Sequence, residues 1–173
     1  MSTATTSAST ANATAADSGP ISSAVVKRLR SELMGLMMAN ISGISAFPDS
    51  DNLLKWRGTI TGAAGTVYEG LKYKLLILFP SNYPYKAPTI TFETPCWHPN
   101  VDEHGNICLD ILKEEWSAIY NIQTILLSLQ SLLGEPNPAS PLNGHAARLW
   151  DNQDEYKRVL LKHYKDHAEG TVE

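Results

Sequence analysis

Cysteine is scarce in this 173-residue chain, which has only Cys96 and Cys108, separated by eleven residues. Two cysteines at that spacing do not make the disulfide framework of a small secreted protein. Residues 1–20 also contain no lysine, no arginine and no apolar run, so they do not resemble a secretory signal. These absences predict a protein of a reducing compartment, the cytoplasm and nucleus.

Long apolar runs and an excess of positive charge are missing as well. No segment approaches the roughly 18 apolar residues of a membrane-spanning helix. Fourteen basic and eighteen acidic residues give a formal net charge of −4 and a pI near 5.7, unlike the basic surfaces that bind nucleic acid or anionic lipid. We therefore expect protein partners, with no nucleic acid and no membrane, and a monomer.

The first 22 residues differ in composition from the rest of the chain. The stretch MSTATTSASTANATAADSGP consists mainly of Ser, Thr and Ala and carries a single charge, so burial cannot offset its ordering entropy. An organellar transit peptide is the alternative, which the missing arginine disfavours. We predict a disordered tail over residues 1–22 and one folded domain over residues 23–173.

Helical periodicity begins after Ser22 or Ser23, either of which can be an N-cap, and continues from Val25 to Met37. The polar face of this helix is a solvated surface or a docking surface, and its basic residues are Lys27, Arg28 and Arg30. A second stripe follows Asn121 and predicts a central buried helix ended by Gly134 as a C′ residue. Its apolar positions are Ile122, Ile125, Leu126, Leu129, Leu132 and Leu133. Two shorter helices are expected, near residues 146–150 and through residues 156–164.

Between these helices the apolar period changes to two. Segments 53–62, 66–79 and 88–93 predict antiparallel strands joined by turns, with residues 73, 75, 77 and 79 on one face. The connection PSNYPYKAP contains three prolines and should be rigid, with Tyr85 held toward solvent. The irregular stretch 94–120 is long for a compact domain and therefore typical of a functional segment. Helices segregated in sequence from the strands indicate the α+β class.

Both cysteines fall in CWHPNVDEHGNICLDILKEEW, and three interpretations compete. A zinc site could use four ligands, but their spacing fits zinc poorly: Cys96, His98, His104 and Cys108. A cysteine hydrolase needs an activated thiolate, yet the apolar and acidic neighbours of Cys108 do not favour a thiolate. Buried free cysteines are the plain structural interpretation. A turn just before Cys108 makes that thiol accessible, which suits an acyl carrier that holds a thioester intact.

A carrier of this kind must stabilise an oxyanion without activating water. A side-chain amide can donate to such an oxyanion, and Asn100 is the candidate. Its alternative role, locking the loop through backbone hydrogen bonds, is compatible with the first.

The segments HPNVDEHGNICLDIL, FPSNYPYKAP, EEWSAIYNIQTILLSLQSLL and EPNPASPLN together resemble the ubiquitin-conjugating enzymes (E2) over residues 23–167. GISAFPDSDNLLKW, TPCWHPNVD and ILLSLQSLLGEPN are most similar to the C-type members that act with the anaphase-promoting complex, and SELMGLMM and KWRGTITG to their plant branch. The resemblance implies the UBC fold: an N-terminal helix, a four-stranded antiparallel meander, a central helix and C-terminal helices.

The resemblance also implies a role for individual residues. Cys108 would hold ubiquitin as a thioester, Asn100 would be the oxyanion donor and loop anchor, and His98 would be structural. Lys27 and Arg28 would face the activating enzyme (E1), and Ser45 a ubiquitin bound at the back. The patch for a RING-type ligase (E3) would be Tyr85, Trp116, Ala118 and Ile119.

Two positions depart from the expected pattern. Many E2s have an acidic residue where this chain reads Pro138, Ala139 and Ser140, so Ser140 could only position a lysine, and Glu135, the ligase or the acceptor would supply the base. Gln123 stands where human-like C-type enzymes carry arginine.

The expected function is E2 activity in mitotic protein degradation without any cofactor or metal. The alternatives are an E2 for a ubiquitin-like modifier and a non-catalytic E2-like adaptor.

Overall fold

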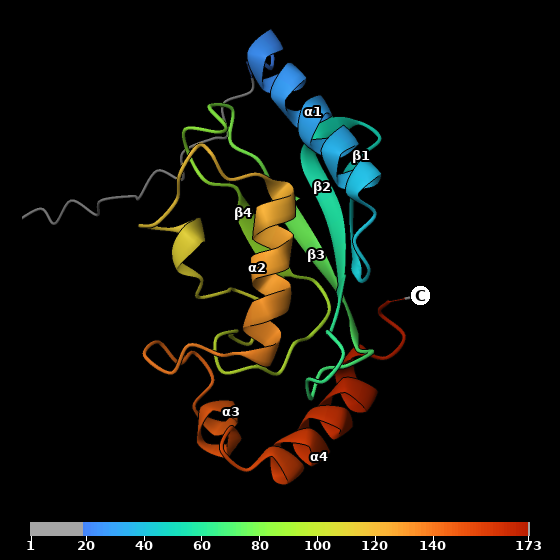
Figure 1. The fold of residues 1–173 in the computed structure, drawn as a ribbon, viewed down its shortest axis with the longest axis vertical. Coiled ribbons are helices and arrows are strands. Elements are labelled where there is room, and N and C mark those ends of the chain that lie inside the picture. The colour runs from blue at the N-terminus through green and yellow to red at the C-terminus, as the bar shows by residue number, and fades with distance from the viewer. Residues whose placement is uncertain (1–18, 173) are drawn as a thin grey trace, which may run out of the picture.

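The computed structural model describes residues 19–172, and the greater part of the predicted disordered tail lies outside them. One sheet is covered on one face by a central helix, with further helices at its two ends (Figure 1). The helices are α1 (Ser23–Ala39), α2 (Ile122–Gly134), α3 (Gly144–Leu149) and α4 (Gln153–His163). The strands are β1 (Ile44–Asp49), β2 (Asn52–Thr61), β3 (Lys72–Leu78) and β4 (Thr89–Phe92). This arrangement confirms the α+β class and the predicted N-terminal helix, four-stranded meander, central helix and C-terminal helices.

The sheet is an antiparallel meander in the order β1-β2-β3-β4. Three strands match the segments with a period of two, whereas the fourth, β1, was implied only by the resemblance. The predicted strand 66–79 was too long at its start, because residues 62–71 form turns and β3 begins at Lys72. Along β1 the register shifts between Pro48 and Asp49.

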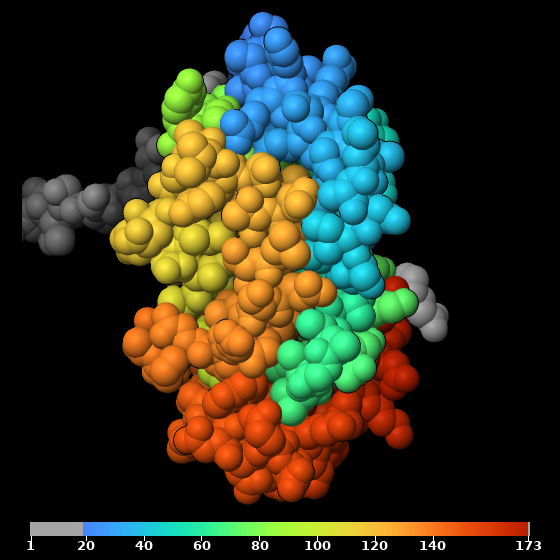
Figure 2. Space-filling view, in the orientation of Figure 1, coloured from blue at the N-terminus to red at the C-terminus, as the bar shows by residue number. Residues whose placement is uncertain are grey.

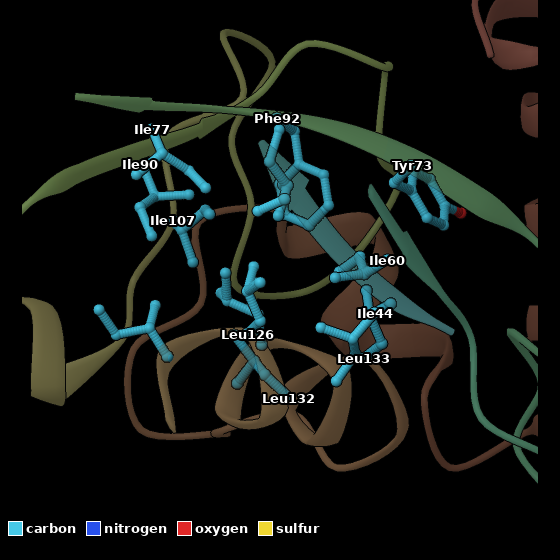
Figure 3. Close-up of a cluster of buried hydrophobic side chains, with 14 of the residues drawn as sticks. Ile44, Ile60, Tyr73, Ile77, Ile90, Phe92, Ile107, Leu126, Leu132 and Leu133 are labelled. Atoms are coloured by element: carbon cyan, nitrogen blue, oxygen red, sulfur yellow. The ribbon is translucent and has the colours of Figure 1, made fainter. Parts of the chain in front are cut away.

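Apolar side chains from α2 and the inner face of the sheet form the core (Figure 3). Leu126, Leu132 and Leu133 of α2 face strand residues such as Ile77 and Phe92 in that view. All six positions predicted for the buried stripe of α2 are buried. Asn121 caps this helix, and its side chain accepts a hydrogen bond from the Thr124 amide at 2.9 Å. The helix therefore forms a rigid support beneath the irregular segment.

The prediction that Gly134 is a C′ residue was wrong. Gly134 is the last residue of α2, and its φ is not among the positive values found in the chain. A Cβ atom at this position would lie 2.6 Å from Thr66 Cγ2. Close packing against the 62–71 turns, and not a left-handed turn, requires the glycine here.

Helix α1 buries a narrower stripe than its apolar pattern predicts. Ser22 is its N-cap, and the inward side chains are Val25, Leu29 and Leu36. Met37 was expected in the buried stripe but is 59% exposed, because it lies a quarter-turn past Leu36 and α1 covers only one end of the sheet.

The C-terminal helices lie at the opposite end of the sheet from α1 (Figure 1). Asn143 and Asn152 cap α3 and α4, and a π-helical turn, Tyr164–Ala168, extends α4. Tyr156 of α4 packs against Trp97 with ring centroids 4.7 Å apart, and so joins α4 to the irregular segment. Within residues 19–172 no helix is long and apolar enough to cross a bilayer.

Candidate active site

The irregular segment between β4 and α2 holds Cys108 on a fixed backbone. The Cys108 amide donates to the Asn100 carbonyl at 2.9 Å, which closes a loop between the two residues. Inside that loop the Asp102 carboxylate accepts hydrogen bonds from the amides of His104 and Asn106. Gly105 has φ +84°, and a Cβ there would lie 2.2 Å from the Phe92 carbonyl oxygen, so only glycine fits. The turn before Cys108 is thus determined locally.

The two thiols lie in different environments. Cys96 is buried, and desolvation raises the pKa of its thiol. Cys108 is half-buried, and within the described residues its sulfur has no hydrogen-bond partner. A shallow groove begins at the adjacent Leu109 and follows α2 past Leu127 to Glu135. Only Cys108 is therefore placed to react with a large partner.

Asn100 is fully buried and anchors a distant loop. Its Nδ2 donates to the carbonyls of Asn137 at 2.8 Å and Ser140 at 2.9 Å, and its Oδ1 accepts from the Asn137 amide at 2.8 Å. This is the geometry of a loop anchor. Both side-chain N–H groups are engaged, so donation to an oxyanion requires that Asn100 exchange one of these carbonyls for it.

His98 is a structural residue with a fixed neutral tautomer. Its Nε2 donates to the Leu132 carbonyl at 2.7 Å, and its Nδ1 accepts from the Asn100 amide at 3.0 Å. Burial lowers its pKa to about 4. His104 is exposed, 3.5 Å from the Glu103 carboxylate. No group of three or more potential metal ligands gathers anywhere in residues 19–172, so the four residues weighed for zinc do not converge.

Tyr85 and Ile119 project from two loops that lie side by side. They are 83% and 82% exposed, whereas Trp116 and Ala118 are half-buried. Trp116 Nε1 donates to the Pro84 carbonyl at 2.9 Å, which joins the loops. Figure 2 shows the proline-rich connection (green) and the 110–120 segment (yellow) next to α1 (blue). These four residues form one patch.

Known proteins are similar to this chain in sequence and in fold. A family model described as "Ubiquitin-conjugating enzyme" matches residues 28–164. The "Ubiquitin-conjugating enzyme E2-20 kDa" of Schizosaccharomyces pombe is 69% identical over 144 residues, which is 82% of each chain. The chain belongs to the ubiquitin-conjugating enzyme family. The E2 domain of a Toxoplasma gondii ubiquitin conjugating enzyme superposes on this E2 with a TM-score of 0.75 at 37% identity, covering 83% of this chain and 99% of that one.

Membership in this family implies ubiquitin, an E1 and an E3 as partners of the enzyme. Lys27 on α1 is exposed, as a contact with the E1 requires. Arg28 is half-buried, and its guanidinium donates to the carbonyls of Ala118 at 3.1 Å and Tyr120 at 2.7 Å. The cation predicted to face E1 is thus bound within the E2 itself.

Ser45 is the candidate contact for a ubiquitin bound at the back, and Ser140 is the candidate that positions the lysine. Ser45 is half-buried in the edge strand β1, beside the exposed Phe47 on the outer face of the sheet. Ser140 is half-buried, and its carbonyl is one of those bound by Asn100. Its hydroxyl has no hydrogen-bond partner among the described residues, so it is available to an incoming group.

Sequence reasoning missed Glu32, whose carboxylate is only 6% exposed. Its Oε1 accepts from the Tyr83 hydroxyl and the Ile122 amide, both at 2.8 Å, and Arg28 lies 3.3 Å from its other oxygen. A signal existed in the sequence: Glu32 follows Arg28 by four residues and shares the inward face of α1 with Leu29 and Leu36.

The E2 should lose stability as the pH falls from about 6.5 to about 4. In this range the His98 ring takes up a proton in the unfolded chain but stays neutral in the folded enzyme, so a lower pH favours unfolding. His98 is neutral in the folded state, so its contribution is complete above pH 6.5 and is lost as the pH approaches 4. The full shift is equivalent to roughly 3 kcal/mol. Urea unfolding across this range should show a shallower pH dependence for His98→Gln, whose amide can replace both hydrogen bonds. Identical slopes in the two proteins would contradict this assignment.

Proposed function

We propose that this E2 carries ubiquitin as a thioester on Cys108. The Cys108 sulfur attacks the carbonyl of the E1–ubiquitin thioester, and the E1 thiol leaves. A lysine amine then attacks the new thioester, the Cys108 thiolate leaves, and the amine loses a proton as the isopeptide bond forms. The observation that carries this proposal is that Cys108, unlike Cys96, is accessible beside a groove, on a backbone fixed by Asn100.

The surroundings of Cys108 favour a carrier over a hydrolase. A cysteine hydrolase uses a histidine base that is itself oriented by a third group. His98, the nearest histidine to Asn100 in sequence, has both ring nitrogens occupied and a depressed pKa. His98 therefore cannot activate water, and the exposed His104 makes no hydrogen bond to the Cys108 sulfur among the described residues. A thioester on Cys108 would thus persist until a lysine arrives.

Transfer of ubiquitin to a lysine would use the loop that Asn100 anchors. Ser140 would accept a hydrogen bond from the incoming amine, and its hydroxyl is available for this contact. Because Pro138 and Ala139 offer no carboxylate, the proton would pass to Glu135, which lines the groove, or to a group of the ligase or acceptor. Asn100 would donate to the oxyanion by exchanging one of its two carbonyl partners.

We also propose that the enzyme acts with a RING-type ligase, the anaphase-promoting complex, in mitotic protein degradation in the cytoplasm and nucleus. The C-type segments around residues 43–56, 94–102 and 125–137 support this branch. Gln123 in place of the C-type arginine weakens any degradation signal at that position. The ligase would bind the ligase-facing patch, which comprises Tyr85, Trp116, Ala118 and Ile119.

The test is to incubate the E2 with ATP and either ubiquitin or a ubiquitin-like modifier, each with its own E1. A thiol-sensitive adduct with ubiquitin alone is expected. An adduct with only the other modifier would assign the enzyme to that pathway, and no adduct with either would indicate an adaptor.

The identity of the ligase is tested with enzyme already loaded with ubiquitin. The loaded enzyme should discharge faster with the anaphase-promoting complex than with an unrelated RING-type ligase. Equal rates with the two would contradict the C-type assignment.

A further inference from the structure

A buried ion pair on α1 lies next to both loops of the ligase-facing patch. Arg28 Nε is 3.3 Å from Glu32 Oε2, one helical turn away, and the Glu32 side chain is almost completely buried. A buried carboxylate is costly unless hydrogen bonds satisfy its oxygens. The donors that satisfy Glu32 therefore show which parts of the enzyme this pair holds together.

Glu32 connects α1 to the proline-rich connection and to α2. Its Oε1 accepts from the Tyr83 hydroxyl and from the Ile122 amide, each at 2.8 Å. Tyr83 lies two residues before the exposed Tyr85, and Ile122 is the first residue of α2, where backbone amides lack partners within the helix. One carboxylate oxygen thus fixes the base of one patch loop against the start of the central helix.

Arg28 holds the other loop. Its Nη2 donates to the carbonyls of Ala118 and Tyr120, on either side of Ile119. Its guanidinium carbon also lies 5.7 Å from the centre of the Tyr83 ring, so the same side chain contacts both loops. Ile119 itself points away, at 82% exposed. The backbone that presents Ile119 is therefore set from below by Arg28.

These contacts end at the patch and do not reach the Cys108 loop. Trp116 joins the two loops through Pro84, and its ring lies 6.0 Å from that of Tyr83. In contrast, the hydrogen bonds of Asn100 and His98 connect the Cys108 loop to residues 132–140, at the other end of α2. Damage to the ion pair should consequently disturb ligase recognition while leaving the chemistry at Cys108 intact.

We propose that Arg28 and Glu32 are positioning residues for the ligase-facing patch, which set the response of the E2 to its ligase without touching ligase or ubiquitin. This inference rests on the proposed function, because it takes the patch to be the ligase contact. It reassigns Arg28 from the E1 surface to the support of the E3 surface. Lysine cannot replace it, since an ammonium lacks the planar fork that reaches two carbonyls and a carboxylate together.

The experiment compares Arg28→Lys and Glu32→Gln with two controls, the exposed neighbour Lys27→Ala and the patch variant Tyr85→Ala. For each, discharge of the Cys108 thioester is measured against increasing concentrations of a RING-type ligase that accelerates the wild-type enzyme. Discharge to free lysine without ligase and the rate of E1 loading are measured in parallel. Arg28→Lys keeps the net charge of α1, and Glu32→Gln keeps an oxygen for Tyr83 and Ile122, so both changes are conservative.

Both variants should raise the half-saturating ligase concentration about tenfold, as expected when a charge-assisted hydrogen bond is lost. Discharge to free lysine and E1 loading should stay within about twofold of wild type, because the Cys108 loop is not involved. The Trp116 indole N–H resonance, assigned with Trp116→Phe, should shift in both variants, since its loop is displaced. Lys27→Ala should leave both the ligase response and this resonance unchanged.

An unchanged ligase response in Arg28→Lys and Glu32→Gln would overturn the inference. An equal loss of discharge to free lysine would also overturn it, because the pair would then support the whole fold. If Tyr85→Ala weakens the ligase response while the ion-pair variants do not, the inference fails and the proposed patch stands. If Tyr85→Ala has no effect on the response, the patch itself is wrong.

Discussion

Replacing Cys108 with alanine should abolish loading with ubiquitin, and replacing it with serine should give an adduct that resists thiols. Alanine removes the nucleophile, whereas the serine oxygen forms an oxygen ester in place of the thioester. Non-reducing and reducing gels after incubation with E1, ATP and ubiquitin distinguish the three outcomes. This effect is the largest expected here, since it removes the bond on which the activity depends.

Cys96→Ser is the matched control for both variants. Cys96 is buried and its thiol pKa is raised, so it should form no adduct, and the variant should load like the wild type apart from a modest loss of stability. A thioester that survives in Cys108→Ala but disappears in Cys96→Ser would overturn the assignment of the nucleophile.

Asn100→Ala should slow transfer of ubiquitin to lysine by about one hundred to one thousand-fold while loading continues. Loss of an oxyanion donor typically costs about 2.7 to 4 kcal/mol in the transition state. Single-turnover discharge of preloaded enzyme to free lysine measures this step alone. Loading is a different reaction with the E1 thioester, and its rate is measured separately on the same variant.

The loop-anchor role of Asn100 makes a different prediction for the same variant. Three hydrogen bonds tie its amide to Asn137 and Ser140, so their loss should destabilise residues 137–140. Asn137→Ala is the matched control, because it keeps the backbone partners of Asn100 and the donor itself. If Asn100→Ala impairs loading and discharge by the same factor, anchoring alone explains the residue and the oxyanion role is wrong.

The spacing of apolar residues predicted correctly the helices and strands that bury one regular face. The six buried positions of α2 and the alternation in β3 follow directly from spacing. Met37 and Gly134 were misassigned because their surroundings come from distant elements: the end of the sheet that α1 covers, and the Thr66 side chain. Such contacts leave no trace in a window of a dozen residues.

In the candidate site, too, local features could be predicted from the sequence and long-range contacts could not. The turn before Cys108 follows from the local residues Asp102 and Gly105, and the sequence indicated it. The partners of Asn100 lie about forty residues further along, and those of Arg28 about ninety, so no spacing rule could identify them. The chemistry of a carrier suggested both roles of Asn100, and the resemblance supplied the role of Arg28. Only the three-dimensional contacts show that the Asn100 amide is engaged as an anchor and that the Arg28 guanidinium is bound inside the enzyme.

The shift of register at Pro48 also affects how this enzyme behaves in a crowded solution. β1 is an edge strand, and an exposed edge is a template for intermolecular strand pairing and aggregation. Proline withholds one amide donor from this six-residue strand, and the irregularity beside it interrupts the regular ladder. The phenyl ring of Phe47 can therefore stay exposed on the adjacent face with little risk that a second sheet will add to this edge.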